Sequence, residues 1–345
     1  MHCAPILITT LCRYQHFVRL IESLRRNEWA EYTEVYIGLD FPAQTKHVDG
    51  YNKINEYLNG NFNEFKAFHV IRRKENYGSA RNIKDLRQMV LSTNDCYIRA
   101  DDDAEFSPNF IKYMNICLRK YRDDKTVFAV AGYSYPLQWK VSDGATILFQ
   151  NFICPVWGIG YWKDKFNEMY DYIATRKSLR NNANDIILSG AYDRLMNTSK
   201  SEFVDLCLSP DFNSTLASFA SDIAMNMYVA INNKYVVTPV LSKVRNWGFD
   251  GSGEYCADYK ARKGGINAYN YPYHTQVIDD ADDFILVEDV FLANNENRAI
   301  FNKFDVLPFK VRAISKCKLC LYRLLGERYY FKTILWIRKI KSFIL

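Results

Sequence analysis

The sequence of 345 residues lacks any run of about 20 apolar residues, the length that a membrane-spanning helix needs. Its first residues, MHCAPILITTLCRY, lack the charged segment and long apolar stretch of a signal peptide. It has neither a Gly-x-Gly-x-x-Gly turn nor a Walker A sequence, which argues against the usual dinucleotide-binding and P-loop interpretations. We therefore expect neither a membrane-spanning helix nor a secretory leader.

The nine cysteines are odd in number and scattered, a pattern that favours reduced thiols in the cytoplasm. Cys317 and Cys320 form a Cys-x-x-Cys pair, but a structural zinc ion needs four ligands and no second Cys or His pair lies nearby. The sequence therefore predicts a cytoplasmic protein without a zinc ion at this pair.

Positive charge is concentrated at the C-terminal end. The net charge is +6, and residues 310–345 hold ten Lys or Arg and one acid, so this tail carries +9 and the remainder −3. The mildly acidic remainder is unlike a nucleic-acid-binding domain. In the tail, apolar and basic residues alternate as in amphipathic helices on an anionic membrane surface. We expect attachment to the inner face of the plasma membrane; the alternative is a helix that caps the folded body.

The first part of the chain alternates apolar strands with amphipathic helices, which predicts a Rossmann-like, doubly wound α/β sheet with helices on both faces. Strands are predicted at Ala4–Thr10, Thr33–Asp40, Lys66–Arg72 and Cys96–Ala100, and helices at Tyr14–Asn27, Thr45–Leu58, Ser79–Leu91 and from Ser107 to about Tyr121. The last of these is expected to use Ser107 as N-cap and Pro108 as its first residue.

The second part is less regular. Strands are predicted at Thr126–Tyr133, Ile147–Ile153 and Tyr235–Val240, a turn running into a helix at Pro155–Phe166, a helix at Thr215–Asn232 and a long loop over residues 242–280. A loop of that length in a compact protein is usually functional or mobile.

Asp101, Asp102 and Asp103 follow an apolar strand directly. Adjacent carboxylates repel one another, and a divalent cation would relieve that repulsion. Oxygen ligands of this kind suit Mg²⁺ or Mn²⁺, with phosphates and water completing the coordination. The alternative is a solvated acidic turn.

The segment from Asn76 to Asn82 (NYGSARN) is a glycine turn that leads into a helix. Free N–H groups at a helix N-terminus favour a phosphate, and Arg81 in the first turn is unfavourable unless it meets an anion. The alternative is an ordinary turn with a surface arginine.

Together these features resemble a GT-A glycosyltransferase, of family 2 or the N-acetylglucosaminyltransferase I-like group. The matching segments are Thr9-Thr10 with Arg13, Asp40, the Asn76–Asn82 turn, the acidic triplet as the DXD element with Asp102–Phe110, Pro155–Trp162 and Pro239–Gly253. The resemblance spans residues 4–255. It implies a nucleotide-binding half at 1–133 and an acceptor-binding half at 134–304. The charge and apolar pattern described above adds a basic amphipathic helical tail at 305–345.

The resemblance also implies roles for individual residues. Asp103 would ligate the metal ion, and Asp101 and Asp102 would contact the sugar and ribose of the donor. Asp101 stands where the relatives carry Glu, which leaves the preferred sugar open. The remaining donor-binding residues would be Thr9, Arg13, Asp40 and Arg81, with Arg13 and Asp40 at the nucleobase; His274 would be an additional metal ligand.

An inverting transferase needs a base that takes the proton of the acceptor hydroxyl. Asp222 is our candidate, because it precedes Pro239 on a predicted helix as in the related enzymes; Asp211 and Asp185 are the alternatives. As acids are favoured near helix N-termini in any case, Asp222 also fits a purely structural role. Trp157, Trp162 and Trp247 are candidate stacking walls for a sugar or base, or core residues.

The sequence thus predicts a metal-dependent hexosyl- or N-acetylhexosaminyltransferase. It would move a sugar from a nucleotide diphosphate, in the first instance UDP, to a hydroxyl of a glycan or lipid-linked glycan in bacterial surface polysaccharide synthesis. The alternatives are a sugar-1-phosphate nucleotidyltransferase, for which Thr9–Arg13 lacks the glycine-rich loop, and a non-catalytic scaffold of the same fold.

Overall fold

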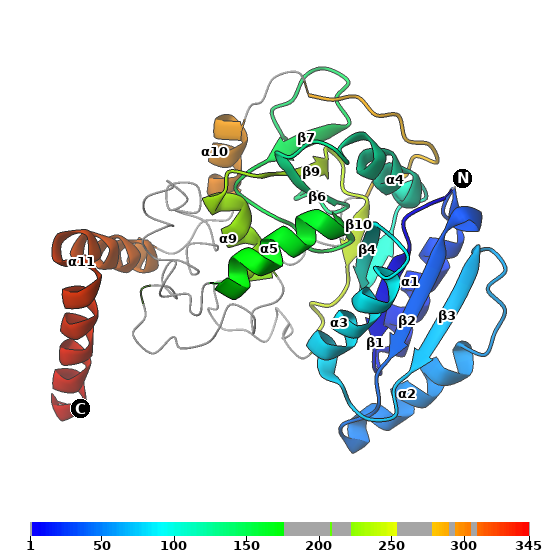
Figure 1. Cartoon of the computed structure of the whole chain (residues 1–345), viewed down its shortest axis with the longest axis horizontal. Helices are drawn as coiled ribbons and strands as arrows, with labels where there is room; N and C mark the ends of the chain where they lie inside the picture. Colours follow the sequence, from blue (N-terminus) through cyan, green and yellow to red (C-terminus); the bar gives the residue numbers. More distant parts are fainter. Residues whose placement is uncertain are drawn as a thin grey trace. The chain divides into compact units, whose positions relative to one another are not determined.

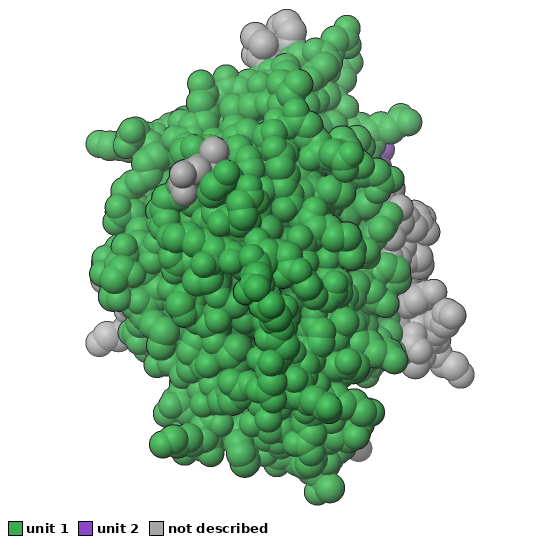
Figure 2. Space-filling view, turned by 90° about the vertical axis from the view of Figure 1, so that its right-hand side faces the viewer, with its two compact units in different colours: residues 1–150, 155–167, 235–293 green, residues 151–154, 168–234, 294–345 purple. Residues whose placement is uncertain are grey.

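The computed structural model describes residues 2–175, 208, 222–253, 278–289, 294–304 and 309–344. In these ranges the chain forms two compact units (Figures 1 and 2). Unit 1 comprises residues 1–150, 155–167 and 235–293 and is drawn in green in Figure 2. Unit 2 comprises residues 151–154, 168–234 and 294–345.

An eight-stranded mixed sheet runs through unit 1 in the order β3-β2-β1-β4-β8-β6-β9-β7. Its strands are β1 (Ile6–Thr10), β2 (Glu34–Leu39), β3 (Ala67–Arg72), β4 (Cys96–Asp101), β6 (Val127–Ala131), β7 (Ile147–Gln150), β8 (Ile159–Trp162) and β9 (Tyr235–Pro239). Strands β1 to β4 are parallel, β8 is antiparallel to both β4 and β6, β9 is parallel to β6, and β7 is antiparallel to β9. Two short strands, β5 (Ala104–Phe106) and β10 (Val244–Asn246), pair antiparallel outside this sheet.

The helices of the described residues differ in length. They are α1 (Tyr14–Arg25), α2 (Thr45–Tyr57), α3 (Gly78–Val90), α4 (Phe110–Lys120), α5 (Lys163–Thr175), α9 (Asp222–Ile231), α10 (Asn294–Phe304) and α11 (Phe309–Ile344), with a 3₁₀ turn, η1, at Ala30–Tyr32. In the described ranges, no helix combines the length and hydropathy needed to cross a bilayer.

The side chains of β2 point alternately to the two faces of the sheet, and they show that a helix covers each face. Ile37 and Leu39 are buried in the same apolar core as Phe17 of α1. Gly38, between them, points to the other face, where a Cβ would lie only 2.5 Å from Oδ1 of Asn82 in α3. Because successive side chains of a strand face opposite ways, α1 and α3 lie on opposite sides of the sheet. The predicted α/β sheet with helices on both faces is confirmed.

The boundaries of most predicted elements in the first part agree with the structure to within one or two residues, but the start of α4 does not. The N–H of Phe110 bonds the carbonyl of Ser107 at 3.1 Å, so residues 107–109 form a turn and Asn109 precedes the helix. The Ser107 hydroxyl donates to Oδ1 of Asn109 at 2.9 Å instead of accepting from a helix N–H. The predicted cap was therefore wrong, because the serine side chain serves the turn.

Strand β8 was not predicted. Its four residues, IGYW, were assigned to a turn, yet they form the antiparallel link between β4 and β6. The predicted loop over 242–280 contains β10, and residues 254–277 of it lie outside the described residues. Of the predicted helix at Thr215–Asn232, the structure describes α9. The predicted division at residues 133 and 304 stays a prediction.

Candidate active site

The carboxyl ends of β1, β2 and β4 meet at one edge of the sheet. Thr9 of β1 is in register with Asp101 of β4, and Thr10 with Leu39 of β2. The residues that follow these strands are therefore neighbours, although the sequence separates them widely. In open α/β sheets this edge is where ligands bind.

Arg13 and two acids of the triplet form the centre of this edge. The guanidinium of Arg13, which directly precedes α1, makes ion pairs with both Asp102 and Asp103, the latter at 2.8 Å between Nη1 and Oδ2. The hydroxyl of Thr10 donates to Oδ2 of Asp102 at 2.9 Å. One positive charge is thus shared by two carboxylates. This contact is distinct from the role at the nucleobase predicted for Arg13, which stays a prediction.

Asp102 and Asp103 are both buried, and Asp103 differs in the hydrogen bonding of its carboxylate. Burial and the nearby carboxylates of Asp102 and Asp101 raise the pKa of Asp103 to about 7, although Arg13 opposes the shift. Its Oδ1 is buried and has no hydrogen-bond partner among the described residues. Buried carboxylate oxygens are normally satisfied, so this atom marks a place for a ligand.

Asp101 has a different environment from the other two acids. Its Oδ1 accepts a hydrogen bond at 2.9 Å from Arg99, two residues earlier on β4. The Asp101 carboxylate, together with the ring hydroxyl of Tyr161, raises the pKa of the Arg99 guanidinium above its usual value, against the effect of burial. Asp101 therefore has a cationic partner of its own within the strand.

The segment after β10 returns over the triplet. Strand β10 pairs with β5, with Asn246 opposite Ala104, and the N–H of Trp247 bonds the carbonyl of Asp103 at 2.8 Å. The next residue, Gly248, lies so close that a Cβ would approach Oδ2 of Asp103 to 2.1 Å. A side chain at 248 would therefore have to displace the carboxylate.

Side chains from α1 and β5 hold this returning segment. The indole N–H of Trp247 donates to Glu105 of β5 at 2.8 Å, and the guanidinium of Arg19 lies 4.3 Å from the indole centroid. Nε2 of His16 lies 2.9 Å from a carboxylate oxygen of Asp250. The segment therefore has three side-chain anchors in addition to its strand pairing.

Ser242 and Lys243, in the segment Pro239–Gly253, make contacts that hold the backbone. The N–H of Lys243 bonds the carbonyl of Gly132 at 2.8 Å. Its ammonium is buried and makes an ion pair with Asp279, while the Ser242 hydroxyl donates to the carbonyl of Val244 at 2.8 Å. Burial lowers the pKa of Lys243, and Asp279 opposes that shift. These contacts fix the start of β10.

Asp40 joins the end of β2 to the turn before α3. Its Oδ1 accepts the N–H of Phe41 at 2.9 Å and that of Tyr77 at 2.8 Å, while the side-chain amide of Asn76 donates to the carbonyl of Phe41 at 2.7 Å. Asp40 is buried. One oxygen of Asp40 therefore supports the backbone, and its predicted role at the nucleobase stays a prediction.

Arg81 lies on the surface of the first turn of α3. Its Nη1 pairs with Glu75 at 2.9 Å, and its guanidinium stacks 3.6 Å from the ring centroid of Tyr77. Gly78 begins the helix with φ 69°, a left-handed conformation that glycine adopts without strain. The sequence predicted that Arg81 would meet an anion, and in the structure that anion is the carboxylate of Glu75.

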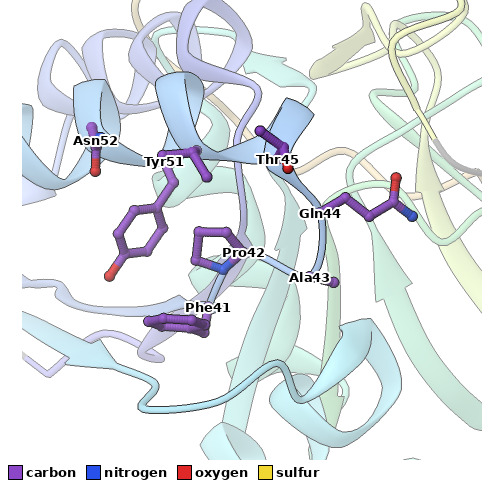
Figure 3. Close-up of a pocket in the computed structure, with 8 residues that line it drawn as sticks. Phe41, Pro42, Ala43, Gln44, Thr45, Tyr51 and Asn52 are labelled. Atoms are coloured by element: carbon purple, nitrogen blue, oxygen red, sulfur yellow. The ribbon is translucent and has the colours of Figure 1, made fainter.

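A hollow of about 550 Å³ opens beside Asp40 (Figure 3). Phe41, Pro42 and Tyr51 contribute rings to its lining, and the rings of Phe41 and Tyr51 lie 6.1 Å apart. The other residues of the lining are Ala43, Gln44, Thr45, Val48 and Asn52. An open site with exposed aromatic faces suits a flat ligand.

Helix α2, which forms one wall of the hollow, packs closely on the loop that carries Arg13. A Cβ at Gly50 would lie 1.9 Å from the carbonyl oxygen of Cys12. Only glycine permits this approach, because any larger side chain would overlap the backbone.

Several predicted site residues lie beyond what the structure describes. Asp222 is the first residue of α9, but its side chain is not described. His274, Asp211 and Asp185 lie outside the described residues. The base and the additional metal ligand stay predictions. Thr9 belongs to β1, but Thr10 makes the contact with the triplet.

The three candidate tryptophans differ in their surroundings. Trp162 is buried and its indole N–H donates to the carbonyl of Leu118 at 3.1 Å, so it is a core residue. Trp157 packs edge-on against Tyr133 and Phe249. Trp247 lies in the segment over the triplet, as described above, and directly precedes Gly248.

The acids present fit a divalent cation that is bound together with a phosphate ligand. Among the described residues, no three His, Cys, Asp or Glu side chains form a metal-binding group by themselves. However, Mg²⁺-type sites often use one or two carboxylates and take their other ligands from substrate phosphates and water. The unpartnered Oδ1 of Asp103 supplies such a carboxylate.

Structural comparison aligns about half of this chain with solved structures that include a mannosyltransferase. The mannosyltransferase PcManGT from Pyrobaculum calidifontis, in complex with GDP-Man and Mn²⁺, aligns with a TM-score of 0.34 and 13% identity over 50% of this chain and 47% of its own. Residues 1–349 of S. aureus TarS in complex with UDP-GlcNAc align with a TM-score of 0.34 and 12% identity over 50% and 48%. The UDP complex of the same protein gives 0.34 and 13% over 53% and 56%.

The chain therefore spans about half the length of these solved structures. No protein-family model matches it, and no curated protein matches it in sequence.

Proposed function

We propose that this protein is a metal-dependent, inverting glycosyltransferase that moves a sugar from a nucleotide diphosphate, in the first instance UDP, to a hydroxyl group. The observation that supports it most is the acidic edge of the sheet. There Asp103 keeps a buried oxygen that has no hydrogen-bond partner in the described part of the chain, while Arg13 and Thr10 hold its neighbour Asp102.

The hollow beside Asp40 fits the nucleobase end of the donor. It adjoins the end of β2, and its lining includes the exposed ring of Phe41 and the partly buried ring of Tyr51. The acidic triplet follows β4, and β1 separates β4 from β2 in the sheet. A nucleotide lying across the carboxyl ends of these strands would place its base at the hollow and its diphosphate at Asp103.

Asp103 would hold the divalent cation, with His274 as a further ligand. A bound cation neutralises the charge that develops on the leaving diphosphate. Asp102 is oriented by Arg13 and Thr10 and would accept hydrogen bonds from hydroxyl groups of the donor. Asp101, supported by Arg99, would contact the donor from the neighbouring position.

Asp222 would accept the proton of the attacking hydroxyl. The acceptor oxygen approaches the anomeric carbon from the side opposite the diphosphate and forms the new glycosidic bond as the bond to the diphosphate breaks. Its proton passes to the carboxylate, and the nucleoside diphosphate leaves with the electron pair of the broken bond. We propose a glycan or lipid-linked glycan of bacterial surface polysaccharide synthesis as acceptor. A hexose and an N-acetylhexosamine are the donor sugars to compare first.

A thermal-shift panel of nucleotide sugars, each with and without Mn²⁺, tests this proposal. UDP-sugars are expected to raise the melting temperature only when Mn²⁺ is present, and Asp103→Asn is expected to abolish this synergy. Asp143→Asn makes the same chemical change at an exposed loop position and should leave it intact. Release of UDP in the presence of glycan acceptors then measures transfer.

Two outcomes would contradict the proposal. Stabilisation by nucleoside triphosphates and sugar phosphates, but not by nucleotide sugars, would indicate a nucleotidyltransferase. No stabilisation by any nucleotide sugar, with the wild-type protein folded, would indicate a protein without donor binding.

A further inference from the structure

The C-terminal helix α11 is divided into two segments by Gly326. This residue has φ 67° and ψ 167°, values that interrupt a helix and that glycine tolerates best. Figure 1 accordingly draws α11 as two straight segments that meet at a bend. The first segment runs from Phe309 to the glycine and the second from the glycine to Ile344.

One side of each segment is buried. Leu319 and Tyr322 in the first segment and Tyr330 and Phe331 in the second are nearly inaccessible to solvent. The hydroxyl of Tyr330 donates to the carbonyl of Leu208 at 3.1 Å, and the rings of Tyr322 and Tyr330 lie 5.3 Å apart. This side of α11 therefore packs within unit 2, as a capping helix would.

The other side of the first segment carries an exposed apolar stripe. Phe309 is 79% exposed and Leu324 is 82% exposed. Ala313, Cys317 and Cys320 lie between them at steps of three or four residues, which places all five along one side of the helix. Both cysteines are exposed free thiols.

A second stripe follows the glycine. Tyr329 is 61% exposed and Trp336 is 63% exposed, and they are seven residues, or two turns, apart. Ile340 lies one turn beyond Trp336 on the same side and is also exposed. Large apolar side chains that are exposed in a continuous row usually mark a contact surface.

Basic side chains border both stripes. Lys316 is four residues before Cys320, and Lys332 and Lys339 are four residues before and three after Trp336; all three are exposed. Residues 310–345 contain ten Lys or Arg and a single acid, Glu327. Aromatic and apolar residues flanked by cations are the pattern of helices that lie in the interface of an anionic bilayer.

We propose that the exposed side of α11 docks on the headgroup region of an anionic lipid bilayer, while its buried side keeps the helix attached to unit 2. A second copy of this chain is a poorer occupant, because the like charges of two such tails repel. Nucleic acid would pair with the cations but not with the rows of exposed apolar side chains. This proposal does not depend on the donor or the acceptor of the reaction.

Co-sedimentation with vesicles tests the proposal on the full-length protein. Vesicles of equal parts phosphatidylglycerol and phosphatidylcholine are expected to bind it, phosphatidylcholine alone to bind it weakly, and high salt to reduce the binding. The double variant Leu324→Ser, Trp336→Ser keeps the net charge and should lower partitioning roughly tenfold or more, because two large apolar groups are lost from the interface. The matched control is Leu241→Ser, Ile285→Ser, which alters two exposed apolar residues of unit 1.

The fluorescence of Trp336 also reports how deeply this side chain enters the bilayer. Lipids brominated on their acyl chains should quench part of the tryptophan fluorescence, and Trp336→Phe should remove that part while the protein still binds. Three results would overturn the proposal: wild type that stays in the supernatant, equal sedimentation of wild type and the Leu324/Trp336 variant, or a dimer in lipid-free solution that this variant dissociates. Circular dichroism and melting temperature confirm that each variant is folded.

Discussion

Gly248 lies directly against the carboxylate of Asp103, although 145 positions separate the two residues in the sequence. A Cβ on Gly248 would come within 2.1 Å of Oδ2 and 2.8 Å of Cγ of Asp103. The same backbone bonds Asp103 through the N–H of Trp247. The segment after β10 thus determines where this carboxylate can lie.

Gly248→Ala is expected to destabilise the fold by about 1–3 kcal/mol, the usual cost of an added methyl group that forces its neighbours to move. In an Asp103→Ala background the obstructing carboxylate is gone, so the same substitution should cost much less. Urea unfolding of the four proteins measures this coupling. Additive effects would mean that residues 103 and 248 do not press on each other.

The stability of the wild type should respond to the protonation of Asp103. The pKa of Asp103 in the folded protein is about 7, whereas the pKa of an unperturbed Asp is about 4. Between these values the folded protein retains a proton that the unfolded chain has lost, so stability falls as pH rises, by up to about 1.4 kcal/mol per pH unit. Asp103→Asn lacks this titration, and its stability relative to the wild type should increase between pH about 4 and about 7.

Urea unfolding of the wild type and of Asp103→Asn across this pH range, without metal, gives the difference directly. Asp143→Asn serves as the control and should run parallel to the wild type. A constant offset between Asp103→Asn and the wild type would show that the carboxyl is ionised throughout.

Asp222→Asn is expected to lower kcat by roughly 10²–10⁴, the range for losing a general base, while the affinity for the UDP–Mn²⁺ complex stays nearly unchanged. Calorimetry and steady-state kinetics separate the two effects. Weakened nucleotide binding would place Asp222 on the donor side. Full activity would transfer the role of base to Asp211 or Asp185.

Phe41→Ala should lower the affinity of the protein for UDP and for UDP-sugars by the same factor, because the ring would contact only the base. A stacked base is worth roughly 1–3 kcal/mol, which corresponds to about fivefold to more than a hundredfold in affinity. Tyr329→Ala removes an exposed ring from α11 and should leave nucleotide affinity unchanged. Unaltered affinity in Phe41→Ala would separate the hollow from the donor site.

The sequence predicted the acidic edge because its signal is local. An apolar strand that ends in three carboxylates is visible in six consecutive letters of β4 and two more beyond it. The contacts of Arg13 were not predictable in this way, since its guanidinium reaches Asp102 across 89 positions of sequence. Their pairing depends on the parallel register of β1 and β4, which a single sequence does not encode locally.

The same limit explains why β8 and the segment over Asp103 were missed. Gly160 of β8 packs closely on α4, since a Cβ there would lie 2.9 Å from Met114 and 3.1 Å from Leu118, but in the sequence this glycine looks like a turn signal. Trp247 was noted as a possible stacking wall, but its bond to Glu105 follows from the pairing of β10 with β5. The tail showed its charge in the sequence, whereas its division into a buried and an exposed side needed the structure.

The contact between Gly50 and the carbonyl of Cys12 joins the two ends of the candidate donor site mechanically. Helix α2 carries Tyr51 in the wall of the hollow, and the loop beneath Gly50 continues directly into Arg13. With no space between them, α2 cannot move toward this loop without pushing it. A ligand in the hollow that shifts α2 in that direction would therefore displace Arg13, which the two aspartates share. Occupation of the hollow would in this way change the position of charged groups at the acidic triplet.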